Sequence, residues 1–136
     1  MAVSLRDVVS FGRYEPLFRI ASGGMAEVNA ARIRREAGFQ KLVAIKRIHP
    51  HLAGDPHFIA MFLDEARIAA QINHPNVVQI YELGELEGNY FIAMEYLYGE
   101  SLAVVGNHVV KKRRRFPPAI AAHVIARVCE GLHAAH

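Results

Sequence analysis

Lys46 and Ala44 are the first residues whose types and spacing suggest chemistry. They belong to the apolar stretch Val43-Ala44-Ile45-Lys46, which is typical of a strand. Side chains alternate between the two faces of a strand, so these two would share one face. Ala44 leaves room for a flat ring, and Lys46 adds a positive charge further along. The pair could bind a heterocycle that carries an anionic group; the alternative is a lysine exposed to water on an edge strand.

Glu65 is a carboxylate within the apolar stripe of a predicted helix. It lies three residues after Phe62 and four before Ala69. A carboxylate on a packing face is costly unless a cation meets it, and Lys46 on the preceding strand is the predicted partner. The alternative is that Glu65 lies at the rim of the stripe and reaches water. The stripe consists of Phe58, Met61, Phe62, Ile68, Ala69 and Ile72.

Two backbone segments could complete such a site. The small-residue turn Ala21-Ser22-Gly23-Gly24 would let backbone N–H groups approach a phosphate, although a plain hairpin has the same signature. The apolar segment Phe91-Ile92-Ala93-Met94 passes abruptly into a connector, 95–99. A connector of this kind offers backbone carbonyl and N–H groups to a planar heterocycle, or is an ordinary exit loop.

Local signals place these residues on a sheet with one helix. Asp55 can cap a helix that Pro56 opens, and His74-Pro75 ends that helix after about Ile72. Gly88-Asn89 predicts a tight hairpin turn. The strands are predicted at 14–20, 26–33, 39–48, 77–83 and 90–94. Consecutive strands with short turns predict an α+β fold, a five-stranded antiparallel sheet with one packed helix.

The last third of the chain is predicted to be helical. Ser101 can cap a short helix, and Pro117-Pro118 opens a longer one. The longer helix is apolar on more than one side, so part of its surface is expected to be exposed to a partner. The apolar residues at helical spacing are Ile120, Val124, Val128, Leu132 and Ala135.

Length and composition limit the class of protein. A chain of 136 residues, 52% hydrophobic, forms one small domain or a piece of a larger one. The single cysteine, Cys129, excludes an intrachain disulfide framework and fits a reducing interior. No apolar run reaches about 18 residues without a charge, and the N-terminus lacks the pattern of a signal peptide. We therefore expect no membrane span and a cytoplasmic location.

The net charge of +3 owes much to one run, from Lys111 to Arg115. We expect a solvated loop between two helices; a patch for nucleic acid or another anionic surface is the alternative. Glu130, His133 and His136 are spaced three apart and could share a helix face. They lie at the chain end with no further ligand in view, so we predict packing or surface roles and no metal site.

The order of these features resembles the protein kinase pattern. A glycine-rich turn precedes V-A-I-K, a helical glutamate follows, and then come His74-Pro75-Asn76-Val77-Val78 and Met94-Glu95-Tyr96. The run Gly23-Gly24-Met25-Ala26-Glu27-Val28 resembles bacterial serine/threonine kinases. The resemblance covers about residues 14–136. It implies an N-terminal extension at 1–13, an ATP-binding small lobe at 14–97 and the start of the helical large lobe at 98–136.

The resemblance also implies roles for individual residues. Lys46 would bind the α- and β-phosphates of ATP and pair with Glu65, Met94 would guard the back of the pocket, and Val28 and Ala44 would pack on the adenine. Ala21 and Ala26 stand where the family usually has the first and third loop glycines. The implied ATP-binding residues are Ile20, Ala21, Ser22, Gly23, Gly24, Met25, Ala26, Glu27, Val28, Ala44, Lys46, Met94, Glu95 and Leu97.

A complete kinase also needs a catalytic Asp and ligands for Mg²⁺. The three aspartates, Asp7, Asp55 and Asp64, neither follow H-R nor precede F-G, so we predict that this chain alone does not transfer phosphate to a protein substrate. It is either the ATP-binding part of an active kinase or a non-catalytic module that binds a nucleotide or a partner. The missing large lobe or a second copy are the expected partners of its apolar helix, with no specific nucleic acid.

Overall fold

The computed structural model describes residues 12–136, which form two compact units. The first unit contains the described residues up to Gln71, together with Gln79–Tyr96. The second contains Ile72–Val78 and Leu97–His136. Most of the extension predicted at 1–13 lies outside the described residues. Asp7 is among the residues that are not described.

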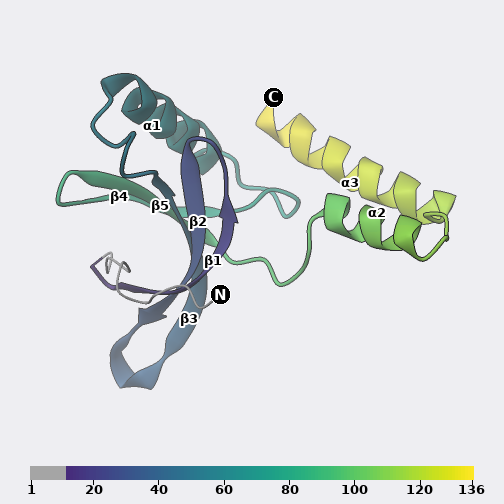
Figure 1. Cartoon of the computed structure of the whole chain (residues 1–136), viewed down its shortest axis with the longest axis horizontal. Coiled ribbons are helices and arrows are strands. Elements are labelled where there is room, and N and C mark those ends of the chain that lie inside the picture. Colours follow the sequence, from purple (N-terminus) through teal and green to yellow (C-terminus); the bar gives the residue numbers. More distant parts are fainter. Residues whose placement is uncertain (1–11) are drawn as a thin grey trace. The chain divides into compact units, whose positions relative to one another are not determined.

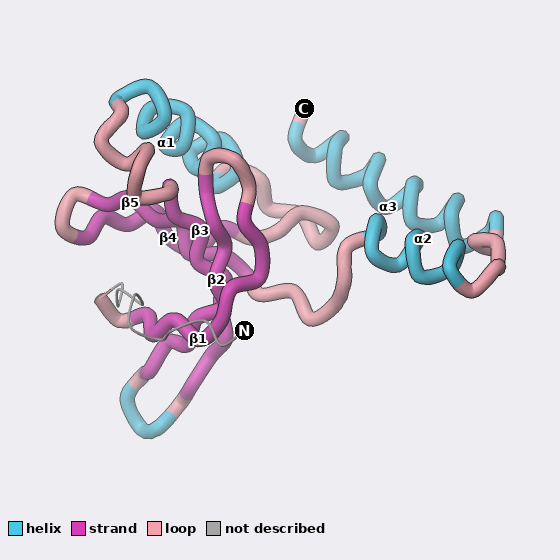
Figure 2. The backbone as a smooth tube through the Cα atoms, in the orientation of Figure 1, coloured by secondary structure: helices cyan, strands magenta, loops and turns pink. Residues whose placement is uncertain are grey.

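The first unit is built on a five-stranded antiparallel sheet with the strand order β1-β2-β3-β5-β4 (Figure 2). This confirms the predicted α+β class. A short 3-10 turn, Glu36–Gly38, joins β2 to β3. The strands are β1 (Tyr14–Ser22), β2 (Ala26–Arg34), β3 (Gln40–Ile48), β4 (Ile80–Leu86) and β5 (Asn89–Glu95).

One helix, α1 (Pro56–Ala70), packs against this sheet (Figure 1). As predicted, the Asp55 carboxylate caps it, accepting a hydrogen bond of 2.9 Å from the His57 N–H. Phe62 and Ala66 are buried against the sheet residues Ala26, Ile48 and Ile92. Burying a phenylalanine stabilises a fold by about 1.5–3 kcal/mol, so Phe62 is the main attachment of α1.

The two faces of the sheet carry separate clusters, because neighbouring residues of a strand point to opposite sides. On β3, Val43 and Ile45 belong to the cluster away from α1. Ile48 belongs to the cluster under α1, and Ala44 and Lys46 share its side of the strand. The cluster away from α1 consists of Tyr14, Ala31, Ile33, Val43, Ile45, Phe91 and Ala93.

Several predicted boundaries differ from the structure. β4 begins at Ile80 instead of residue 77, because a turn closed by the Val77 N–H and the His74 carbonyl occupies the preceding residues. α1 ends at Ala70, two residues early. The hairpin turn is Glu87-Gly88, where both residues have positive φ, and Asn89 already pairs with Leu86.

The predicted stripe of α1 is also partly wrong. Met61 and Ile68 are exposed, whereas Ala66, which was not in the stripe, is buried beside Phe62. Ile59 packs against the same cluster. The buried face is therefore rotated relative to the prediction, because large apolar residues on both flanks of a helix hide which flank meets the sheet.

The second unit contains the predicted helices α2 (Leu102–Lys111) and α3 (Pro118–Ala135). The Ser101 hydroxyl caps α2 by accepting from the Val104 N–H at 3.3 Å. A cavity of about 180 Å³ lies between the helices. Among the described residues, no helix is long and apolar enough to cross a membrane. The residues lining the cavity are Leu102, Gly106, Phe116, Ala121, Val124 and Ile125.

The turn before β4 is fastened to α3 within the second unit. The Asn76 side-chain amide donates to the Arg127 carbonyl at 2.9 Å and to the Glu130 carboxylate at 3.1 Å. Gly131 permits this approach, because a Cβ there would lie 3.1 Å from the Asn76 carbonyl oxygen. Glu130, considered above as a metal ligand, thus has protein partners. As predicted, α3 exposes apolar side chains: Ile120, Ile125, Val128 and Leu132.

Candidate functional site

The Lys46 ammonium contacts the Glu65 carboxylate in the first unit. Lys46 reaches it from β3, and Glu65 reaches it from α1. The two side chains are 23% and 49% exposed, so the carboxylate lies at the edge of the interface between helix and sheet. This combines the two expectations for Glu65: it stands at the rim, and it still meets the lysine.

Register places four of the predicted residues on one face. In an antiparallel sheet, directly opposed residues project to the same side. Val28 stands opposite Lys46, and Ala44 stands opposite Met94. Ala44 is buried, while Val28 and Met94 are half-buried. The result is a floor of small and medium apolar side chains with a single cation at one end.

The glycine-rich turn is tighter than expected. Ala21 and Ser22 pair with Val28 and Glu27 as strand residues, so the turn itself is only Gly23-Gly24-Met25. The Gly23 N–H donates to the Ala26 carbonyl at 2.8 Å and closes the turn. Gly23 and Gly24 are exposed, which leaves their surface open to a ligand.

Ala26 is a core residue at the start of β2, where the predicted strand 26–33 also begins. It is buried in the cluster under α1 with Ile48 and Phe62. A glycine at residue 26 would lack the methyl group that these side chains contact. This explains why alanine can stand where the family's loop pattern usually has its third glycine.

His49 holds the glycine-rich turn from β3's end, a contact that the sequence did not suggest. Its backbone N–H donates to the Met25 carbonyl at 3.0 Å. Its ring Nε2 lies 2.7 Å from the Gly23 carbonyl oxygen, a geometry that requires Nε2 to carry the proton. The ring is stacked on His51 with centroids 5.4 Å apart. No local spacing signals this contact, because it joins residues 26 positions apart.

Glu27 directs its side chain away from Lys46. It forms an ion pair with Arg47, directly opposite it on β3, and accepts from the Asn29 amide at 3.2 Å. Burial alone would raise the pKa of Glu27, but Arg47 and Asn29 outweigh it and hold the pKa below its usual value. Only the backbone of Glu27 is therefore available to a ligand near the turn.

Two hydrogen bonds join Glu95, the last residue of β5, to Gln79. The Glu95 N–H donates to the Gln79 carbonyl at 2.9 Å, and the Glu95 carboxylate accepts from the Gln79 N–H at 3.3 Å. Leu97 belongs to the second unit and is exposed.

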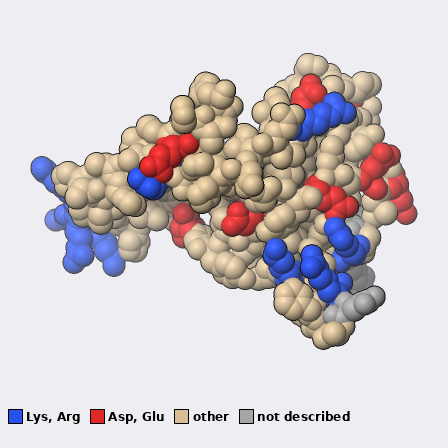
Figure 3. Space-filling view, turned by 180° about the vertical axis from the view of Figure 1, so that it is seen from behind, with Lys and Arg blue, Asp and Glu red and all other residues tan. Residues whose placement is uncertain are grey.

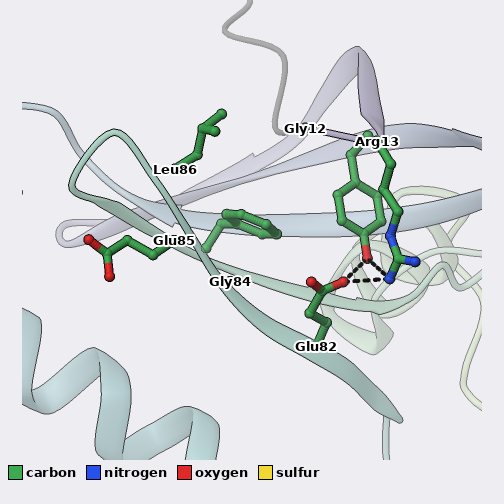
Figure 4. Close-up of a pocket in the computed structure, with 8 residues that line it drawn as sticks. Gly12, Arg13, Glu82, Gly84, Glu85 and Leu86 are labelled. Atoms are coloured by element: carbon green, nitrogen blue, oxygen red, sulfur yellow. Dashed lines mark hydrogen bonds and ion pairs between the residues drawn. The ribbon is translucent and has the colours of Figure 1, made fainter.

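A second cavity, of about 420 Å³, lies on the side of the sheet away from α1 (Figure 4). There the Glu82 carboxylate accepts from the Tyr14 hydroxyl at 2.5 Å and from the Arg13 guanidinium at 2.6 Å. The Tyr14 hydrogen bond first, and Arg13 after it, lower the pKa of Glu82 against the effect of burial. None of the predicted site residues lines this cavity, whose lining is Gly12, Arg13, Tyr14, Glu82, Gly84, Glu85, Leu86 and Phe91.

The sheet, the packed helix and the lysine–glutamate contact lie together in the first unit. A family model described as the protein kinase domain matches residues 14–136. The chain belongs to the protein kinase family. This confirms the resemblance inferred from the sequence.

Named relatives and a solved structure agree with this family. The chain is 44% identical over 126 residues to tyrosine-protein kinase MasK of Myxococcus xanthus, covering 93% of this chain and 20% of the relative. It is 39% identical over 128 residues to the probable serine/threonine-protein kinase pknA2 of Bifidobacterium longum, covering 92% and 16%. The crystal structure of the M. tuberculosis PknI kinase domain matches with a TM-score of 0.70 and 26% identity, covering 98% of this chain and 51% of that one.

Proposed function

We propose that this chain is the ATP-binding part of a kinase that transfers the γ-phosphate of ATP to serine and threonine hydroxyls of proteins. The contact between Lys46 and Glu65 carries the proposal. It holds an ammonium at the end of the apolar floor formed by Val28 and Ala44. Residues 14–97 would form the small lobe, and 98–136 would begin the large lobe. An ATP-dependent reaction of this kind would take place in the cytoplasm.

The floor fits an adenine and its phosphates. Adenine would lie on Val28 and Ala44, with Met94 at the back. The Glu95 carbonyl and the Leu97 N–H would hydrogen-bond the adenine edge. Lys46 would bind the α- and β-phosphates, because a fixed cation there neutralises charge without reorganisation. The turn and its flanking strands would cover the phosphates through their backbone, from Ile20 to Val28.

Phosphate transfer would require parts of the domain that the chain does not contain. The chain spans about half the length of the matched PknI domain and about a fifth of its curated relatives. The base and the Mg²⁺ ligands of the complete kinase would come from the remainder. The chain's own residues bind and orient the nucleotide. Clear transfer of labelled phosphate by the pure chain, abolished by Lys46→Met, would refute this division.

The acceptor is serine or threonine in this proposal because the turn sequence from Gly23 to Val28 resembles serine/threonine kinases. The matched relatives carry both names, serine/threonine kinase and tyrosine kinase. Phosphoamino-acid analysis of a protein substrate treated with the complete kinase decides between them. Phosphotyrosine alone would overturn the acceptor while leaving the nucleotide site intact.

Nucleotide binding is the experiment that tests the proposal on this chain. Lys46→Met is expected to weaken ATP binding about tenfold or more, measured by isothermal titration calorimetry, since a charge-assisted contact to phosphate is lost. Lys41→Met is the matched control, because Lys41 is on the same strand but on the other face, over the Tyr81 ring. Equal losses in the two variants would contradict the proposed role of Lys46.

A further inference from the structure

The run from Lys111 to Arg115 forms the connection between α2 and α3, here called the basic loop. Lys111 is the last residue of α2, and Lys112 caps it. All five side chains are exposed. Figure 3 shows a group of Lys and Arg side chains gathered together on the left of the view. The positive charge of the second unit is therefore concentrated at one end of its helix hairpin.

Among residues 12–136, no carboxylate forms an ion pair with the basic loop. The sequence has no Asp or Glu between Glu100 and Glu130. Within residues 12–136, none of the five cations takes part in an ion pair, and Arg127, the next cation along, is already paired with Glu130. Five adjacent like charges repel one another, so their neutralisation must come from outside the described chain.

The backbone of the basic loop is held in place at both ends. The Arg113 N–H donates to the Val110 carbonyl at 2.8 Å, and the Arg114 N–H donates to the Val109 carbonyl at 3.1 Å. These two hydrogen bonds are the pattern of a Schellman cap. The αL position of such a cap usually holds glycine, but here it holds Arg113, whose φ is 53°. Pro117 and Pro118 restrict the other end. The cations are thus presented on a defined backbone, and a charged residue occupies a position that favours glycine.

The chemistry around the basic loop favours a lipid surface over nucleic acid. Val110, at 71% exposed, offers an apolar side chain next to the charges. The one aromatic residue beside the run, Phe116, lines the cavity between α2 and α3 and is not presented for stacking on bases. Exposed cations beside an apolar residue suit the headgroup region of an anionic bilayer.

We infer that the basic loop binds the surface of an anionic lipid bilayer. Each cation near such a surface contributes about a fivefold increase in partitioning, corresponding to about 1 kcal/mol. Neutralising three cations is therefore expected to weaken binding roughly a hundredfold at low salt, and added salt is expected to weaken the wild type. The inference does not depend on nucleotide binding.

Co-sedimentation of the chain with vesicles tests the inference. The probes are vesicles of phosphatidylcholine alone and vesicles that also contain phosphatidylglycerol. The test variant is Arg113→Gln/Arg114→Gln/Arg115→Gln. The control is Arg19→Gln/Arg35→Gln/Lys41→Gln, which removes the same charge from exposed positions of the first unit. We expect salt-sensitive binding to the anionic vesicles only, lost in the test variant and kept in the control.

Three outcomes would overturn the inference. Equal binding to neutral vesicles would assign the interaction to the exposed apolar residues of α3. Equal losses in the two variants would show a general charge effect. If the chain still bound a DNA duplex at salt concentrations at which it no longer bound the vesicles, the basic loop would be assigned to nucleic acid. Circular dichroism of both variants, expected to match the wild type, verifies that a loss of binding is not a loss of fold.

Discussion

Most of the described cations of the first unit are paired with carboxylates, whereas those of the basic loop in the second unit are not. Six cations of the first unit face a carboxylate within that unit, and in the second unit the five cations of the basic loop face none among the described residues. Figure 3 shows both arrangements, blue beside red in one place and blue alone in another. The paired cations are Arg13, Arg32, Arg34, Lys46, Arg47 and Arg67.

This difference in pairing separates cations that help to organise the fold from cations that have no partner among the described residues. An exposed ion pair contributes only about 0.2–1 kcal/mol, so the pairs of the first unit matter mainly by fixing where side chains point. Lys46 is fixed in this way toward the α1 side of the sheet. The basic loop has no such internal partner. Removing a paired charge of the first unit should therefore alter stability or nucleotide binding, and replacing the cations of the basic loop by glutamine should alter neither.

Removing the attachment of α1 is expected to have the largest effect. Phe62→Ala deletes a fully buried ring and should cost about 3–5 kcal/mol of unfolding free energy, measured by urea denaturation. Glu65 loses its support, so nucleotide binding should be lost as well. Phe62→Leu, a milder variant, should remain folded with a smaller loss. A cost below about 1 kcal/mol for Phe62→Ala would mean that α1 is held by other contacts.

Breaking the most buried pair should have a smaller effect that depends on pH. Glu27→Gln is expected to cost about 1–2 kcal/mol at pH 7, because Arg47 loses its charged partner. The folded-state pKa of Glu27 is lowered, so its contribution is present above the unfolded pKa and is lost as pH falls through the folded value. The difference between wild type and variant should thus shrink on acidification below about pH 4.5.

A matched surface pair provides the control for Glu27. Asp64→Asn breaks the exposed pair with Arg67, whose side chains are 67% and 65% exposed. Its cost should stay below about 0.5 kcal/mol at every pH. Equal costs for the two variants in urea denaturation would contradict the ranking by burial.

The contact of His49 with the turn predicts an effect on nucleotide binding. His49→Ala should weaken ATP binding about fivefold, since one hydrogen bond of about 1 kcal/mol no longer holds Gly23. His51→Ala removes the stacked ring, which has no such contact, and should leave affinity nearly unchanged. Titration calorimetry of both variants makes the comparison. Unchanged affinity in His49→Ala would show that the turn is held without it.

A small gain in stability is predicted for one change in the basic loop. Arg113→Gly relieves the positive φ and should stabilise the second unit by about 0.5–1 kcal/mol in thermal unfolding. Arg114→Gly, at a position without positive φ, should bring no gain. A loss of stability in Arg113→Gly would mean that the arginine side chain has a structural role in the folded chain.

The elements were predictable from the sequence because their signals are local. The cap at Asp55 and the apolar strands can be read within a few residues. The order of the glycine-rich turn, V-A-I-K, the helical glutamate and the later motifs was enough for the family. The burial of Ala26 could not be predicted in this way, because it depends on how β2 and β3 pair across the sheet. The direction of the Glu27 side chain and the contact of His49 with Gly23 depend on the same register. Which face of α1 is buried depends on how the helix packs on the sheet.

The most direct test of the nucleotide site is a titration of the ¹⁵N-labelled chain with MgATP, followed residue by residue by NMR. The account predicts that the amide shifts concentrate in residues 20–28 and around Ala44, Lys46 and Glu95, while Arg13, Tyr14, Glu82 and the basic loop stay unchanged. Shifts centred on the Glu82 cavity or on the basic loop, with the turn unaffected, would contradict it.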